Sequence, residues 1–79
     1  MSKEFTLDLA QDRAALKITK LTNNGKTRLK LLQMGITPGT KIEVLRHAPL
    51  ADSLVICVRG SKLALRRNEA KEISVVEAE

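Results

Sequence analysis

The side chains best suited to metal chemistry are few in this chain. It has one histidine, His47, and one cysteine, Cys57, and the carboxylates considered with them are Glu43 and Asp52. A transition-metal site usually needs three or four convergent ligands, and neither C-x-x-C nor H-x-x-H spacing occurs. The sequence therefore predicts no metal site within the chain and no resident cofactor. A metal ion shared between two subunits stays open.

The sequence also lacks the motifs that usually accompany a catalytic nucleophile. Ser53 and Ser61 lie outside any G-x-S-x-G elbow, and His47 has no matched orienting carboxylate in the sequence. The glycines are dispersed, so they build no phosphate-binding loop. The sequence predicts that the protein is not an enzyme. Cys57 is interpreted as a small apolar strand residue, and His47 as a solvated residue at the end of a loop.

The charge balance is basic. Fourteen Lys and Arg stand against nine Asp and Glu, for a net charge of +5, which favours nucleic acid, anionic lipid or an acidic protein surface as partner. Phe5 is the only aromatic residue, and both single-strand nucleic-acid platforms and polyproline grooves rely on aromatic rings. The composition therefore disfavours RNA, single-stranded DNA and Pro-rich peptides as partners.

Two groups of residues are candidates for binding a protein partner. The pair Arg66-Arg67 lies where a strand passes into a helix, and its guanidinium groups offer bidentate contacts to carboxylates. The loop from His47 to Asp52 carries Pro49 and Leu50, and exposed apolar atoms on a loop indicate docking. The candidate partner-binding residues are Arg46, His47, Pro49, Leu50, Arg66 and Arg67.

All of these candidates except the basic pair lie in a helix–turn–strand unit between Leu31 and Leu50. The apolar helical residues before Gly35 end there, because glycine adopts the left-handed conformation that closes a helix. The run Thr37-Pro38-Gly39-Thr40 has the residue types of a type II turn. Ile42 and Val44 then alternate with polar residues as in a half-buried strand, which is expected to end in Arg46-His47-Ala48-Pro49.

The other elements are short. Thr27 is favoured over Asn24 as the cap of the helix, and Asn68 is expected to cap a single helical turn, Glu69-Ala70-Lys71. The remaining segments are a docking segment and turn in residues 1–14, and strands at Ala15–Leu21, Leu54–Arg59, Lys62–Leu65 and from Ile73 onward.

The strand from Leu54 to Arg59 is apolar on both of its faces. Leu54, Ile56 and Val58 share the face expected to enter the core. Val55 and Cys57 share the other face, where the N-terminal segment or a partner could cover them. Self-association through Val55 and Cys57 is therefore one hypothesis.

The predicted fold is mainly β: a small, partly open barrel of about five strands, with one helix between the first and second strands and a helical turn before the last. All 79 residues are expected to form a single domain, 1–79. No run of about 18 apolar residues is present to cross a membrane, so no direct membrane insertion is expected. The N-terminus is too polar for a secretory signal, which predicts a cytoplasmic protein.

Four segments with distinctive sequences follow one another along the chain: LKLLQMGITPGTKIEV (Leu29–Val44), APLADS (Ala48–Ser53), VRG (Val58–Gly60) and LALRRNEA (Leu63–Ala70). In order and spacing they resemble the FeoA family, whose members typically read along the lines of RLLEMGLTPGTEVEV, APLGDP, a strand ending in RG, and LALR. The resemblance spans roughly Ala15–Val76. A Pro-Gly pair common in the family at the turn near residues 11–13 is absent.

The resemblance implies an SH3-like β-barrel that acts in bacterial ferrous iron uptake as a cytoplasmic accessory to FeoB, a membrane permease bearing a GTP-binding domain. On this hypothesis the protein docks on FeoB, at the inner face of the membrane, and modulates its assembly or activity. A narrower hypothesis is that Arg66 or Arg67 reaches the nucleotide of FeoB as an arginine finger. The alternative class is a small basic nucleic-acid-binding or transcription-regulatory barrel, since FeoA-like domains occur appended to iron-dependent repressors.

Overall fold

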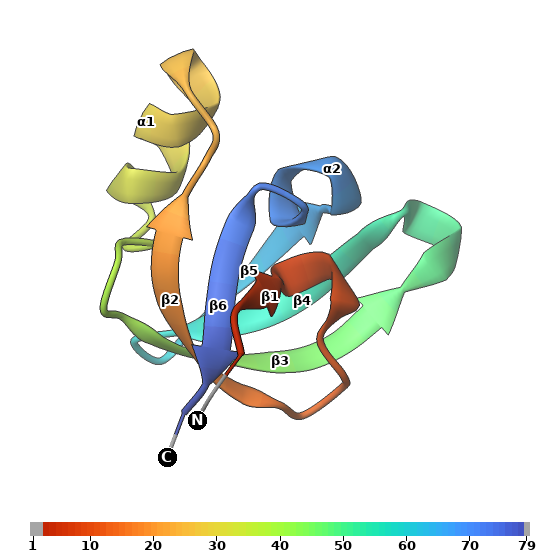
Figure 1. Ribbon diagram of the computed structural model, residues 1–79. Helices are drawn as coiled ribbons and strands as arrows, with labels where there is room; N and C mark the ends of the chain where they lie inside the picture. Colours follow the sequence, from red (N-terminus) through yellow and green to blue (C-terminus); the bar gives the residue numbers. More distant parts are fainter. Residues whose placement is uncertain (1–2, 79) are drawn as a thin grey trace.

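A computed structural model of the chain describes residues 3–78 and shows a curled antiparallel sheet (Figure 1). The strands follow the spatial order β1-β6-β2-β3-β4-β5. In chain order they are β1 (Phe5–Thr6), β2 (Ala15–Leu21), β3 (Lys41–Ala48), β4 (Ser53–Val58), β5 (Ser61–Arg66) and β6 (Ile73–Glu77). The helices are α1 (Gly25–Gln33) and α2 (Arg67–Ala70), and two 3-10 turns are η1 (Leu7–Leu9) and η2 (Pro49–Ala51). Because α2 contacts both β5 and η1, the two ends of the sheet approach each other as in a partly open barrel.

The sheet has six strands where about five were expected. The additional strand is β1, in which Phe5 pairs with Val75 and Thr6 with Ser74. Two residues are too few to display an alternating pattern, so this part of the expected docking segment gave no strand signal. As a result, α1 lies between the second and third strands in chain order, β2 and β3. The prediction that placed it between the first and second strands is wrong in this numbering. The helical turn before the last strand is confirmed as α2.

Alternating apolar residues build the core. Leu54, Ile56 and Val58 of β4 are buried, which confirms the face assigned to them, while Val55 and Cys57 on the other face are half-buried. The ends of β4 and β5 differ from the prediction by a residue, because Arg59 belongs to the turn. Arg59 and Gly60 both have positive φ, as in the two-residue turn that joins a tight hairpin.

Helix α1 is anchored mainly through its last turn. Leu31 is its one fully buried residue. The N–H of Gly35 donates to the carbonyl of Leu32 (3.0 Å) and the N–H of Ile36 to that of Leu31 (3.0 Å), which is the hydrogen-bond pattern of a Schellman motif. Gly35 has φ +89°, so the predicted helix end is confirmed. Figure 1 shows the rest of α1 projecting from the sheet.

The start of α1 corrects the predicted cap. The N–H of Arg28 donates to the carbonyl of Asn24 (3.5 Å), so Asn24 is the N-cap residue. Its side chain makes no capping hydrogen bond. The preference for Thr27 is wrong because Thr27 already lies inside the helix.

The turn after α1 has the predicted conformation. The N–H of Thr40 donates to the carbonyl of Thr37 (3.1 Å), and the N–H of Gly39 donates to the carbonyl of Ile18 on β2 (2.7 Å). Gly39 has φ +92°, the value required at the third position of a type II turn. The turn therefore joins α1 to β3 and also fixes both to β2.

Gly39→Ala should lower the free energy of unfolding by about 1 kcal/mol, because the new side chain would occupy a positive-φ site. A Cβ at Gly39 would meet no other atom within 4 Å, so backbone strain is the whole expected effect. In a domain of this size the melting temperature should fall by about 4–8 °C. Gly39→Asn should lose less, because asparagine tolerates positive φ better. An unchanged melting temperature for Gly39→Ala would refute the strain argument.

Strand β3 ends within the predicted run. It continues through Arg46 and His47 to Ala48 and stops directly before Pro49, which cannot donate to the ladder. Val44 pairs with Ile56 and Arg46 with Val55, which leaves Leu45 as an extra residue in a β-bulge. The sequence did not predict this bulge. Figure 1 shows the β3–β4 hairpin reaching away from the rest of the sheet.

Candidate partner-binding surfaces

The hairpin tip exposes apolar atoms, as predicted. Four residues, 49–52, connect the paired residues Ala48 and Ser53. Pro49 starts the 3-10 turn η2, and Asp52 closes it in the left-handed region with φ +51°. Leu50 between them is fully exposed, at 106%. A leucine held in this position contacts no core residue, so its apolar surface is available to a partner.

His47 is not the solvated loop-end residue that the sequence suggested. Its ring Nδ1 lies 2.8 Å from Asp12 Oδ1, and its backbone N–H donates to the same oxygen at 3.1 Å. Ring Nε2 lies 3.4 Å from the carbonyl oxygen of Asp8. His47 therefore ties the end of β3, next to the hairpin tip, to η1 and to the segment that follows η1. Asp12 was missed because it lies 35 positions away in the sequence and carries no local signal.

The hydrogen bond from the His47 side chain is the main cause that lowers the pKa of Asp12 below its ordinary value. A carboxyl group whose pKa is lower in the folded state stabilises the fold above its unfolded pKa, and this contribution disappears as the pH falls through the folded pKa. The stabilisation should therefore be complete above about pH 5 and lost progressively below about pH 4. Since Asp12 is largely exposed, the effect is small.

Acid titration should reveal the Asp12–His47 contact. Wild-type protein should exceed Asp12→Asn in stability near neutral pH, and the difference should shrink as the pH is lowered below about 4. Asp52→Asn is the matched control, since asparagine tolerates the left-handed conformation of this residue. Chemical denaturation at several pH values measures both. A difference between wild type and Asp12→Asn that is independent of pH would contradict the assignment.

The basic pair lies at the junction of β5 and α2. Arg66 is the last residue of β5, and Arg67 begins α2. The predicted cap Asn68 is wrong: Arg66 occupies the N-cap position, and its backbone N–H donates to Glu69 Oε1 at 2.9 Å. Both guanidinium groups belong to exposed residues. Neither makes an ion pair with any residue between 3 and 78.

The structure brings the hairpin loop and the basic pair together. The N–H of Arg67 donates to the carbonyl of Asp52 at 3.0 Å, and Arg66 pairs with Ser53 across the β4–β5 ladder. A hollow of about 300 Å³ between the two segments is lined by Ala51, Asp52, Arg66 and Asn68. Arg46, on β3, lies opposite Val55, two residue pairs further from the hairpin tip than the Ser53–Arg66 pair. Two candidates that were separate in the sequence therefore form one continuous surface.

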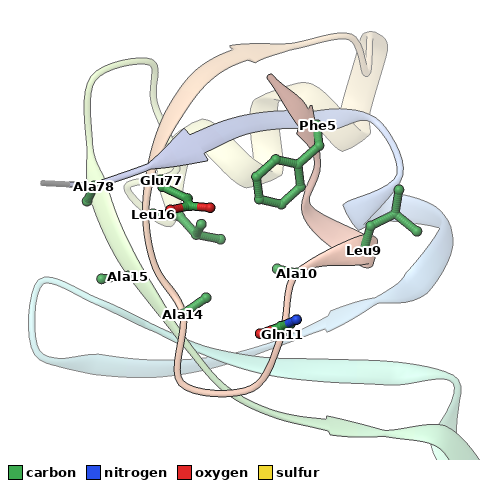
Figure 2. Close-up of a pocket in the computed structure, with 9 residues that line it drawn as sticks. All are labelled: Phe5, Leu9, Ala10, Gln11, Ala14, Ala15, Leu16, Glu77 and Ala78. Atoms are coloured by element: carbon green, nitrogen blue, oxygen red, sulfur yellow. The ribbon is translucent and has the colours of Figure 1, made fainter. Parts of the chain in front are cut away.

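A second surface, which the sequence did not predict, is a hollow of about 490 Å³ (Figure 2). Figure 2 shows Phe5 and Leu9 on one side, with Leu16 and the Glu77 carboxylate on the other. Leu9 is 67% exposed. Its position beside polar residues was the one signal in the sequence that pointed to this surface. The lining residues are Phe5, Leu9, Ala10, Gln11, Ala14, Ala15, Leu16, Glu77 and Ala78.

Potential metal ligands form pairs at most in the part of the chain that the structure describes. No three His, Cys, Asp or Glu side chains between residues 3 and 78 come close enough to hold an ion. Cys57 is half-buried on β4 with a free thiol. None of the helices in this range is both long and apolar enough to span a membrane.

The chain was compared with known families and solved structures. A family model described as the FeoA domain matches residues 5–77. The structure of a FeoA-like protein from Clostridium acetobutylicum is 35% identical with a TM-score of 0.85, and the match covers 100% of this chain and 93% of that one. The FeoA protein from Chlorobium tepidum is 31% identical with a TM-score of 0.87, over 95% of this chain and 71% of that one.

A manganese-dependent transcriptional repressor is also similar, with a TM-score of 0.89 over 99% of this chain and 44% of that one. At 15% identity this likeness shows the fold alone. The expected mainly β, SH3-like architecture is confirmed by these neighbours. Because the family model covers nearly the whole chain, this protein belongs to the FeoA family, which takes part in ferrous iron transport.

Proposed function

We propose that the protein is a cytoplasmic accessory of ferrous iron uptake that binds the FeoB permease and modulates its assembly or activity, without catalysing a reaction itself. Its family membership supports a role in iron transport. The observation that carries the docking proposal is the fully exposed Leu50 beside arginines that have no ion-pair partner among residues 3–78. An exposed apolar side chain next to free guanidinium groups suits a partner surface with an apolar pocket rimmed by carboxylates.

The proposed docking surface is the hairpin tip together with the basic pair. Pro49 and Leu50 supply the apolar contact, while Arg46, Arg66 and Arg67 pair with carboxylates of FeoB. The role of His47 is to position the hairpin, because its ring is already engaged by Asp12. A narrower version, in which Arg66 or Arg67 acts on the nucleotide bound to FeoB, predicts a change in GTP turnover as well as in binding.

Capture of FeoB tests this function. Tagged protein added to native membranes in mild detergent should retain FeoB, and Leu50→Glu should reduce the amount retained by about tenfold or more, the size of effect expected at an interface hot spot. Leu29→Glu is the matched control, because Leu29 is also exposed, at 57%, but lies on α1.

Three outcomes would oppose the docking proposal. Failure to retain FeoB would remove the proposed partner. Equal losses for Leu50→Glu and Leu29→Glu would remove the proposed surface. Steeply salt-dependent retention on DNA or RNA would instead favour the nucleic-acid-binding or regulatory class.

A further inference from the structure

Strand β5 forms one edge of the sheet and pairs on one side only, with β4. Two hydrogen bonds at its end show which way its backbone groups point. The N–H of Arg67 donates to the backbone carbonyl of Asp52, the residue directly before β4 (3.0 Å). The N–H of Arg66 donates instead to the Glu69 carboxylate (2.9 Å). Successive residues of a strand direct their backbone groups to opposite sides. Arg66 therefore points away from β4.

The same direction holds for Lys62 and Ala64. The β4–β5 ladder is regular from the Ser53–Arg66 pair to the Val58–Ser61 pair, with no bulge, so residues two and four positions before Arg66 point outward as it does. Within residues 3–78, the N–H and C=O groups of Lys62 and Ala64 have no hydrogen-bond partner. Both residues are exposed. Ala64 carries only a methyl group, so the centre of this edge is open to another backbone.

We propose that β5 accepts an additional antiparallel strand from a partner. The partner segment is extended and carries two acidic residues four positions apart, with a small apolar residue midway between them. The small residue would lie opposite Ala64, and the two carboxylates opposite Lys62 and Arg66. The backbone groups of Lys62 and Ala64 supply the hydrogen bonds of the added ladder, as in other cases of strand addition. Opposite charges directly across a ladder stabilise the pairing.

The charges at this edge disfavour a second copy of the chain as the occupant. A symmetric antiparallel pair of β5 strands centred on Ala64 would place Lys62 of one protomer opposite the partner's Arg66. Like charges directly opposite each other destabilise a sheet. The charges therefore disfavour pairing of β5 with a second β5 strand and favour pairing with an acidic strand. This preference fits the protein's net charge of +5.

This proposal goes beyond docking on FeoB, because it concerns the backbone edge and not the hairpin tip. Its probe is the peptide acetyl-TEVAVET-amide, titrated into the full chain and followed by amide NMR and hydrogen exchange. The amide signals of Lys62 and Ala64 should shift and saturate, and their exchange should slow. The peptide acetyl-TKVAVKT-amide should bind at least about tenfold more weakly.

Variants at Ala64 separate strand addition from charge attraction alone. Ala64→Pro removes the outward N–H but no hydrogen bond of the β4 ladder, since proline is tolerated where the N–H of an edge strand faces solvent. It should weaken peptide binding by about tenfold or more. The control Ala64→Val keeps the N–H and should bind within about threefold of wild type.

The proposal is overturned by any of three results with the wild-type chain: unchanged Lys62 and Ala64 signals at about 2 mM peptide, shifts centred on another part of the molecule, or equal affinity for the lysine peptide. Peptide binding by folded Ala64→Pro that equals wild type also overturns it. If Ala64→Pro does not fold, the wild-type amide map decides. None of these readouts involves FeoB, so failure here is distinct from failure of the proposed function.

Discussion

Replacing Leu31 by alanine is expected to lower the free energy of unfolding by about 2–5 kcal/mol, the range for deleting a buried leucine side chain. Leu31 has no exposed surface and packs in the core with Ile36, which is equally buried. It is also the residue whose carbonyl closes the last turn of α1. A domain of this length has a total stability of only about 4–12 kcal/mol, so the variant should be largely unfolded well below the melting temperature of the wild type.

Urea denaturation followed by circular dichroism measures this loss. Leu29→Ala is the matched control, because Leu29 lies on the same helix but is 57% exposed and should change stability by no more than about 0.5 kcal/mol. Equal losses for the two variants would mean that burial of Leu31 is not what holds α1 in place, since alanine is at least as good a helix former as leucine at both positions.

Reversing the charge of the basic pair, Arg66→Glu/Arg67→Glu, should reduce FeoB capture by about tenfold or more. The reason is that carboxylates of the partner would then meet carboxylates, and like charges at an interface cost several kcal/mol. The fold should survive, since the structure engages the backbone N–H groups of Arg66 and Arg67 and leaves their guanidinium groups without an ion pair among residues 3–78.

The control for net charge is Lys17→Glu/Lys20→Glu. These two exposed lysines lie on β2, and their reversal changes the charge of the protein by the same amount. FeoB retention should fall much less in this variant. Equal effects would show that long-range attraction, and not the proposed surface, governs binding. Complexes that form normally in the Arg66→Glu/Arg67→Glu variant with unchanged GTP turnover would eliminate both proposals for the basic pair.

Local patterns predicted the elements that depend on neighbouring residues. The alternation of Leu16 and Ile18 with Lys17 and Thr19 predicted β2 with its observed ends, Ala15 and Leu21, because neighbouring residues in this part of the strand face opposite sides of the sheet. Gly35 and Gly39 gave the end of α1 and the turn after it, since few other residues adopt positive φ. The buried face of β4 followed from the same period of two.

Features that depend on distant residues could not be predicted in this way. The bulge at Leu45 shifts the register of β3 against β4, and it depends on how the two strands pair, so neither strand alone displays it. The contact of His47 with Asp12 joins segments 35 positions apart. The hollow beside Phe5 is assembled from separate parts of the chain, so no single stretch of sequence displays it.

The bulge at Leu45 also determines where the hairpin tip points. An extra residue increases the local twist and bends the strand, yet the paired residues on both sides of it, Val44–Ile56 and Arg46–Val55, keep their inner and outer faces. Deletion of Leu45 would therefore straighten the hairpin and re-aim Leu50 while leaving the buried residues where they are. Gain or loss of one residue at this position offers homologous proteins a route to a differently placed partner without rebuilding the core.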